Sequence, residues 1–170
     1  TPNINTNDIG IYGSKGGIQA RTPTGNNAPG AHPIAIGMMP DSSKIYAANL
    51  LHHSLTVLNE EGALLDTINL IADYNPITGG FADNDGNGQI AVGVLPIQSP
   101  VSPDGKAVVI ASTGGQIVIV DTATDKIVKM LPCDPGCHGA NFGAKQGGGY
   151  YAYVTTKFGN RLTVVDIDPN

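Results

Sequence analysis

The sequence has 170 residues, of which 23 are glycine and 12 are proline, and only 14% are charged. This composition is unlike that of a helical bundle, and a hydrophobic content of 41% is too high for a disordered chain, so a strand-rich, turn-rich fold is expected. The formal net charge of −5, without a Lys/Arg cluster, argues against nucleic-acid binding, and no apolar run approaches the roughly 18 residues that span a bilayer.

The first part of the chain, residues 1–31, contains a glycine-centred stretch at 11–20 (IYGSKGGIQA) that is similar to part of the pattern found further along. The sequence begins at Thr1 and shows neither a signal peptide nor a transit segment, as expected for a mature product or a fragment.

Three tandem copies of one pattern follow. They start at His32, Leu95 and His138, and the first two align on Pro-Asp pairs at 40–41 and 103–104. Each copy has an apolar strand, a tight turn, a second strand, a polar turn and a third strand. A fourth strand follows in the first two copies, whereas the third copy stops near the end of its third strand.

The spacing of these copies predicts an all-β fold of β-propeller blades, each made of four antiparallel strands. The starts are 63 and 43 residues apart, and the second value lies in the range of about 40–50 residues for such blades. We therefore expect one partial propeller of about three and a half blades over residues 1–170. A β-sandwich is the alternative, but it would not require repeats in phase.

The expected boundaries follow from the copies. Residues 1–31 belong to a preceding blade, 32–94 form a blade with an inserted loop at 73–88, 95–137 form the next blade, and 138–170 form an incomplete one.

Residues 103–128, which include PDGK, VIAS and QIVIVDTATDKIV, resemble the YVTN-type β-propeller repeat of surface-layer-like and YncE-like periplasmic proteins. Residues 153–156 (YVTT) resemble the tetrapeptide that names the repeat, with Thr in place of Asn. The resemblance covers about residues 32–170. It implies a propeller fold in a periplasmic, cell-surface or secreted protein, and it says little about activity because propellers have many functions.

A closed propeller has at least four blades and usually more. A partial ring would expose apolar sheet faces and unpaired strand edges. We therefore expect another protein chain, or a missing segment, to complete the ring.

The inserted loop contains a candidate calcium site. DNDGNGQI at 83–90 matches the first eight positions of a calcium-binding loop. The expected ligands are the side chains of Asp83, Asp85 and Asn87 and the carbonyl of Gln89. Val94 stands where a bidentate Glu is usual, so Asp73 would have to replace it. An ion-free turn is the alternative.

The two cysteines, Cys133 and Cys137, have three residues between them and are followed directly by His138. A small disulfide loop is the first interpretation, since the spacing permits it and extracytoplasmic proteins favour it. Covalent attachment of haem c is the second, although such attachment usually has two intervening residues. Metal ligation by both thiolates and His138 is the third.

The four histidines form another candidate metal site. His32 and His138 have equivalent positions at the start of an innermost strand, and His52 and His53 lie in a neighbouring loop. Propeller topology places these loops, both cysteines, the insert and Lys157-Phe158 on one face. Converging imidazoles suit copper, zinc or iron, or a role beside haem, and ordinary packing is the alternative.

These features favour a non-catalytic, extracytoplasmic scaffold or binding module within a larger assembly, stabilised by calcium and a disulfide. The first alternative is a subunit of a metal- or haem-dependent redox enzyme that uses the histidine-rich face. The second is a lactonase-like hydrolase.

Overall fold

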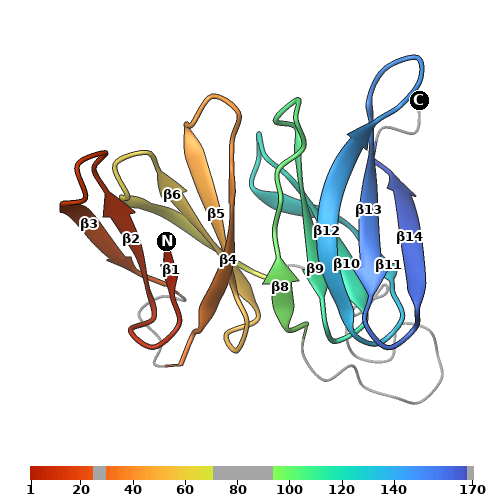
Figure 1. Ribbon diagram of the computed structural model, residues 1–170, viewed down its shortest axis with the longest axis horizontal. Helices are drawn as coiled ribbons and strands as arrows, with labels where there is room; N and C mark the ends of the chain where they lie inside the picture. Colours follow the sequence, from red (N-terminus) through yellow and green to blue (C-terminus); the bar gives the residue numbers. More distant parts are fainter. Residues whose placement is uncertain (25–29, 71–93, 168–170) are drawn as a thin grey trace.

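The computed structural model describes residues 1–24, 30–70 and 94–167. Within these ranges every regular element is a β-strand, and no helix there is long and apolar enough to cross a membrane. The strands form four antiparallel sheets that lie side by side in chain order (Figure 1). The prediction of an all-β fold is therefore confirmed. The inserted loop at 73–88 lies outside the described residues.

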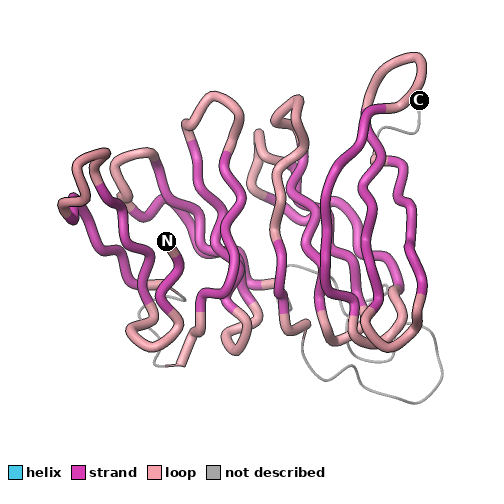
Figure 2. Tube along the Cα trace, in the orientation of Figure 1, coloured by secondary structure: helices cyan, strands magenta, loops and turns pink. Residues whose placement is uncertain are grey.

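Each sheet is a meander whose strands pair in the order of the sequence. The inner strands β1, β4, β8 and β12 contact one another in succession, and the hairpin turns lie at the two ends of the sheets (Figure 2). Two four-stranded sheets are flanked by two three-stranded ones, which is a partial β-propeller. The strands are β1 (Pro2–Asn3), β2 (Asp8–Tyr12) and β3 (Ile18–Pro23) in the first sheet; β4 (Pro33–Met38), β5 (Lys44–Asn49), β6 (Ser54–Asn59) and β7 (Leu64–Asn69) in the second; β8 (Pro96–Gln98), β9 (Ala107–Ser112), β10 (Gln116–Asp121) and β11 (Lys126–Pro132) in the third; and β12 (Cys137–Ala144), β13 (Tyr150–Thr156) and β14 (Arg161–Asp166) in the fourth.

The turns between the second and third strands of three sheets each end in a residue with a left-handed backbone conformation. His53, Gly115 and Asn160 have φ values of 52°, 100° and 49° at the last turn position of the second, third and fourth sheets. This left-handed conformation is easiest for Gly and Asn. The sequences of the three turns differ, and the turn in the third sheet is one residue shorter, but each ends in this left-handed conformation.

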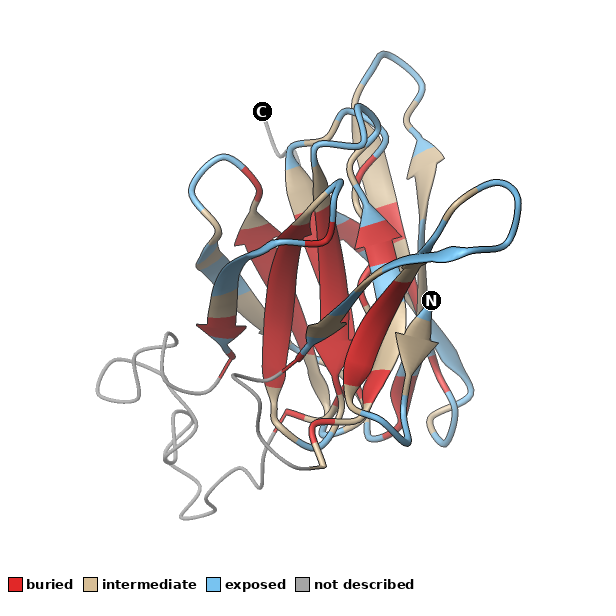
Figure 3. Ribbon diagram, turned by 90° about the vertical axis from the view of Figure 1, so that its left-hand side faces the viewer, coloured by how far each residue is buried: buried red, intermediate tan, exposed pale blue. Residues whose placement is uncertain are grey.

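The core consists of three separate layers, one between each pair of neighbouring sheets. We call the face of a sheet that packs on the next sheet along the chain its forward face, and the opposite face its backward face. Figure 3 shows buried residues gathered along the strands and exposed residues at the turns. Alternation along each strand supplies both faces: in β5, Tyr46 belongs to the forward layer, whereas Ile45 and Ala47 belong to the backward layer.

The inner strands approach closely at one point. A Cβ atom built on Gly37 of β4 would lie 2.0 Å from the carbonyl oxygen of Ser99. Only glycine leaves room for that backbone contact between the second and third sheets. The Ser99 hydroxyl, in turn, donates a hydrogen bond to the carbonyl oxygen of Tyr46 (3.3 Å).

Candidate functional site

One rim of the molecule, at the lower end in Figure 1, collects the turns that hold the histidines and cysteines. A series of hydrogen bonds connects three sheets along it. The Leu95 N–H donates to Nδ1 of His53 (3.1 Å), and the Thr113 N–H donates to the Leu95 carbonyl (3.0 Å). The Gly136 N–H donates to the Thr113 carbonyl (3.2 Å), and the Lys157 N–H donates to the Gly136 carbonyl (2.8 Å). The rim is therefore one connected structure.

Cys133 and Cys137 are paired as a disulfide in the connection between β11 and β12. Their Cα atoms are 6.1 Å apart, which is within the usual range for such a bridge. Cys137 is fully buried, and the Cys133 N–H donates to the Gly115 carbonyl (2.8 Å). Both sulfurs are used in this pairing, and a thioether bond to haem would need a free thiol.

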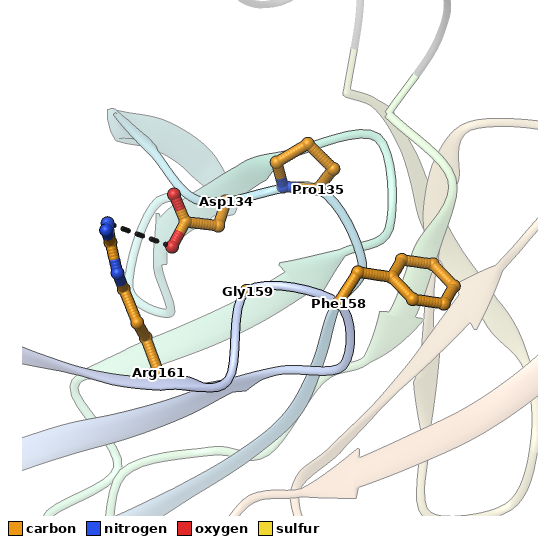
Figure 4. A pocket seen from close by; sticks show the side chains of 5 residues that line it. All are labelled: Asp134, Pro135, Phe158, Gly159 and Arg161. Carbon is orange, nitrogen blue, oxygen red and sulfur yellow. Dashed lines mark ion pairs between the residues drawn. The ribbon is translucent and has the colours of Figure 1, made fainter.

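The loop that the disulfide closes lines an open pocket of about 250 Å³ (Figure 4). Asp134 and Arg161 face each other across it, with Nη1 and Oδ2 3.3 Å apart, and the exposed ring of Phe158 points away from this pair. A Cβ on Gly159 would lie 2.7 Å from Oδ2 of Asp134, so glycine permits this approach. The pocket thus brings two opposite charges together at the rim.

The sequence interpretation did not identify Asp134 and Arg161 as partners. Asp134 lies inside the Cys-x-x-x-Cys loop, and Arg161 begins the strand after the Lys157-Phe158 turn. Only the fold brings the two loops together, so no spacing along the chain could have paired them.

The four histidines lie on the same rim but have separate environments. His52 Nδ1 is 2.9 Å from the Ser54 hydroxyl, whereas the backbone N–H of His32 donates to Oδ1 of Asn7 (2.9 Å). His138 is exposed. Among residues 1–24, 30–70 and 94–167, no three His, Cys, Asp or Glu side chains are grouped so that they could hold a metal ion.

His53 is neutral in this arrangement. Its Nδ1 accepts the Leu95 N–H, which a protonated ring could not do. Burial lowers the pKa of His53, and the neighbouring His52 lowers that pKa further. The role of His53 in the described structure is thus to hold the start of β8 against the turn that precedes β6.

The predicted calcium ligands Asp73, Asp83, Asp85, Asn87 and Gln89 all lie outside the described residues. Val94, at the end of the same segment, is fully buried in the layer between the second and third sheets.

A polar contact between sheets, which no sequence pattern indicates, lies at the opposite rim. The Tyr46 hydroxyl donates to Oδ1 of Asp125 (2.7 Å), and Nζ of Lys44 is 2.7 Å from Oδ2 of the same carboxylate. Tyr46 and Lys44 are in the second sheet, whereas Asp125 ends the turn before β11 in the third. Burial raises the pKa of Tyr46, and its hydrogen bond to Asp125 raises it further.

The forward face of the β12–β14 sheet has no neighbouring sheet in the described structure. Leu162 and Val164 are 57% and 51% exposed there, and Tyr153 and Thr155 lie opposite them in the register. The backward face of the same sheet packs Ala152 and Val154 against the third sheet. One side of this sheet is therefore a core layer, and the other is an exposed apolar surface.

No protein-family model matches the sequence, and no curated protein matches it. Two solved structures are similar in fold: hydrazine synthase of Kuenenia stuttgartiensis, with a TM-score of 0.59 and 20% identity, and a streptogramin B lyase, with a TM-score of 0.59 and 17% identity. The similar region covers 81% of this chain and 33% of the first protein, and 97% of this chain and 50% of the second.

Both of these proteins contain β-propellers, which agrees with the arrangement of the four sheets. Identities of 20% and below show the fold alone. The chain spans between a third and a half of the length of these structures.

Proposed function

We propose that this chain is a non-catalytic propeller module that binds another protein segment within an extracytoplasmic assembly. The exposed forward face of the β12–β14 sheet carries the proposal. A monomeric soluble protein seldom leaves a row of large apolar side chains along one sheet uncovered. Leu162 and Val164 form such a row, whereas the equivalent sides of the second and third sheets are covered by the sheets that follow.

The disulfide supports the extracytoplasmic part of the proposal. Pairs such as Cys133–Cys137 persist in oxidising compartments and are reduced in the cytosol. The resemblance of residues 103–128 to the YVTN-type repeat points to the same location, and membership of that repeat family is part of the proposal.

Bound calcium in the inserted loop is a separate part of the proposal. It is supported by the DNDGNGQI pattern at 83–90, with Asp83, Asp85, Asn87 and Gln89 as ligands and Asp73 completing the set. We expect a chelator to lower the melting temperature of the protein and Asp83→Ala to remove that sensitivity. Asp66→Ala, at an exposed carboxylate outside the insert, should leave the sensitivity intact. A melting temperature that is independent of chelator would contradict the calcium site.

The scaffold role is tested on the protein isolated from its native source without denaturation. We expect it to elute in a stoichiometric assembly, with no Soret band and with no lactone hydrolysis. A Soret band, or stoichiometric copper or iron, would replace the scaffold with the redox subunit. Lactone hydrolysis that depends on a bound metal would favour the hydrolase.

A further inference from the structure

We propose that the forward face of the β12–β14 sheet receives the backward face of a further propeller blade, and that the Tyr153 hydroxyl donates a hydrogen bond to a carboxylate in that blade's turn after its third strand. This inference rests on the proposed function and specifies the partner. The blade lies outside residues 1–170 and is not a second copy of this chain.

The positions on the forward face of the last sheet are equivalent to buried positions in the two preceding sheets. Tyr153 pairs with Val164 in the β13–β14 register, as Tyr46 pairs with Val57 and Val109 with Ile119 in the two preceding sheets. One pair closer to the lower rim, Thr155 is opposite Leu162, as Ala48 is opposite Leu55 and Ala111 is opposite Ile117. The internal members of these sets are buried between sheets, with Val57, Leu55 and Ile117 fully buried and Ile119 8% exposed. The exposed face of the last sheet therefore continues an interface that the molecule already uses twice.

The side chain of Tyr153 is placed to make a contact with the next blade. It occupies the position of Tyr46, whose hydroxyl crosses the interface to Asp125 of the next sheet. The ring of Tyr153 lies over Gly143, where an added Cβ would be 2.8 Å from the ring. Among the described residues the Tyr153 hydroxyl has no hydrogen-bond partner. A carboxylate in the turn of an incoming blade would complete the contact that Asp125 completes for Tyr46.

A second copy of the chain fits this surface poorly. Head-to-tail packing of two copies would bring the backward face of β1–β3 onto this apolar surface. That face carries charge beside the exposed Tyr12: Asp8 lies there, with its carboxylate 2.6 Å from Nδ2 of Asn3 and 3.7 Å from Nε of Arg21. In the other sheets the backward face is aliphatic, as with Ile45 and Ala47 or Val108 and Ile110. Packing the Arg21 side chain, which is 47% exposed, against Leu162 would cost desolvation of its guanidinium.

The experiment adds such a blade to the chain. The extended protein continues from Asp166 into a copy of residues 122–137 and then a copy of residues 95–132. Asp166 and Asp121 both end a third strand, so the first copy supplies the missing fourth strand in register. The second copy supplies a blade whose backward face carries the copies of Val108, Ile110, Val118 and Val120, and whose turn carries the copy of Asp125.

We expect the appended blade to change which substitutions lower the urea midpoint of unfolding. In the unextended chain, Leu162→Ala and Tyr153→Phe should leave the urea midpoint of unfolding unchanged. In the extended chain, Leu162→Ala should lower the midpoint, and Tyr153→Phe should lower it only while the Asp125 copy within the appended 95–132 segment is intact. Val128→Ala in the original β11, where the side chain is 59% exposed, should have no effect in either protein.

Three results would overturn the inference. The first is digestion of the appended residues by protease at concentrations that spare residues 1–166, because the face would then not order a blade. The second is an equal effect of Leu162→Ala in both proteins. The third is reversible dimerisation of the unextended chain that Leu162→Asp abolishes, because the occupant would then be a second copy. None of these readouts depends on the Soret band, the bound metal or the hydrolysis that tests the scaffold role. The further inference and the scaffold role can therefore be contradicted separately.

Discussion

The forward faces of the second and the last sheets carry side chains of the same kind but differ in what covers them. Tyr46 and Leu55 are fully buried on the former, whereas at the equivalent positions Tyr153 is half-buried and Leu162 is 57% exposed. The pairing registers of the two hairpins are the same. Exposure at these positions is therefore set by the presence of a neighbouring sheet and not by the sheet itself, as expected for repeats that each contact only their neighbours.

The first sheet provides the contrasting case. Its backward face carries Asp8 and Arg21, and the ring of Tyr12 lies over Gly10. The two ends of the described structure thus differ in composition: the outer face of the first sheet combines Asp8 and Arg21 with the exposed Tyr12 and Ile18, whereas the outer face of the last sheet carries Leu162 and Val164.

The largest effect expected is from truncating the internal leucine. Leu55→Ala should lower the free energy of unfolding by about 2–5 kcal/mol, because it leaves a cavity in a closed layer. Leu162→Ala should change it by no more than about 0.5 kcal/mol, because the side chain is already in solvent. Urea denaturation of both variants measures the difference. Similar losses for the two would mean that the last sheet is already covered in solution.

Gly37 and Asn141 give the second comparison, since they lie opposite Tyr46 and Tyr153 in the register. Gly37→Ala places a methyl group against the Ser99 carbonyl, a backbone group that cannot move aside, and should cost about 3 kcal/mol. Asn141→Ala, at an exposed position, should cost no more than about 0.5 kcal/mol. Thermal unfolding followed by far-UV circular dichroism would compare them. A tolerated Gly37→Ala would contradict the close approach of the inner strands.

The contact between Tyr46 and Asp125 provides the third comparison, with Tyr153 in the last sheet. Tyr46→Phe should cost about 1.5 kcal/mol, because it removes a buried hydrogen bond to a carboxylate that Lys44 still neutralises. In the unextended chain, Tyr153→Phe should cost nothing measurable. A double-mutant cycle of Tyr46→Phe with Asp125→Gly, which removes the acceptor and keeps the left-handed turn conformation, isolates the pairwise energy. Strictly additive losses in that cycle would show that the hydroxyl and the carboxylate do not interact.

The repeat pattern was sufficient to predict the fold, because each copy places its own strands and turns within some 40 residues. The continuous apolar run at 107–111 also indicates that both faces of that sheet are buried, and the structure has them so. The proximity of Cys133 and Cys137 could be predicted as well, since only three residues separate them.

The contacts between sheets could not be predicted in this way. Asp125 and Tyr46 are far apart in sequence, and nothing local marks Asp125 as more than a polar turn residue. The topology predicts that the histidines share a rim, and it offers them as a metal site if their rings converge. Their separate hydrogen bonds depend on how far each ring lies from the next sheet, as His53 and Leu95 show.

The smallest effect expected concerns pH. Because burial lowers the pKa of His53 in the folded state, the unfolded chain takes up the proton first as pH falls below about 6.5. The free energy of unfolding should therefore decrease from that pH down to the lowered pKa. His53→Asn should reduce this dependence, since Asn keeps the left-handed turn conformation, as Asn160 does in the last sheet. The control is His138→Asn at an exposed position, which should keep the slope of the wild-type protein. Urea titrations between pH 8 and pH 5 test this, and a slope that persists in His53→Asn would assign the dependence to other groups.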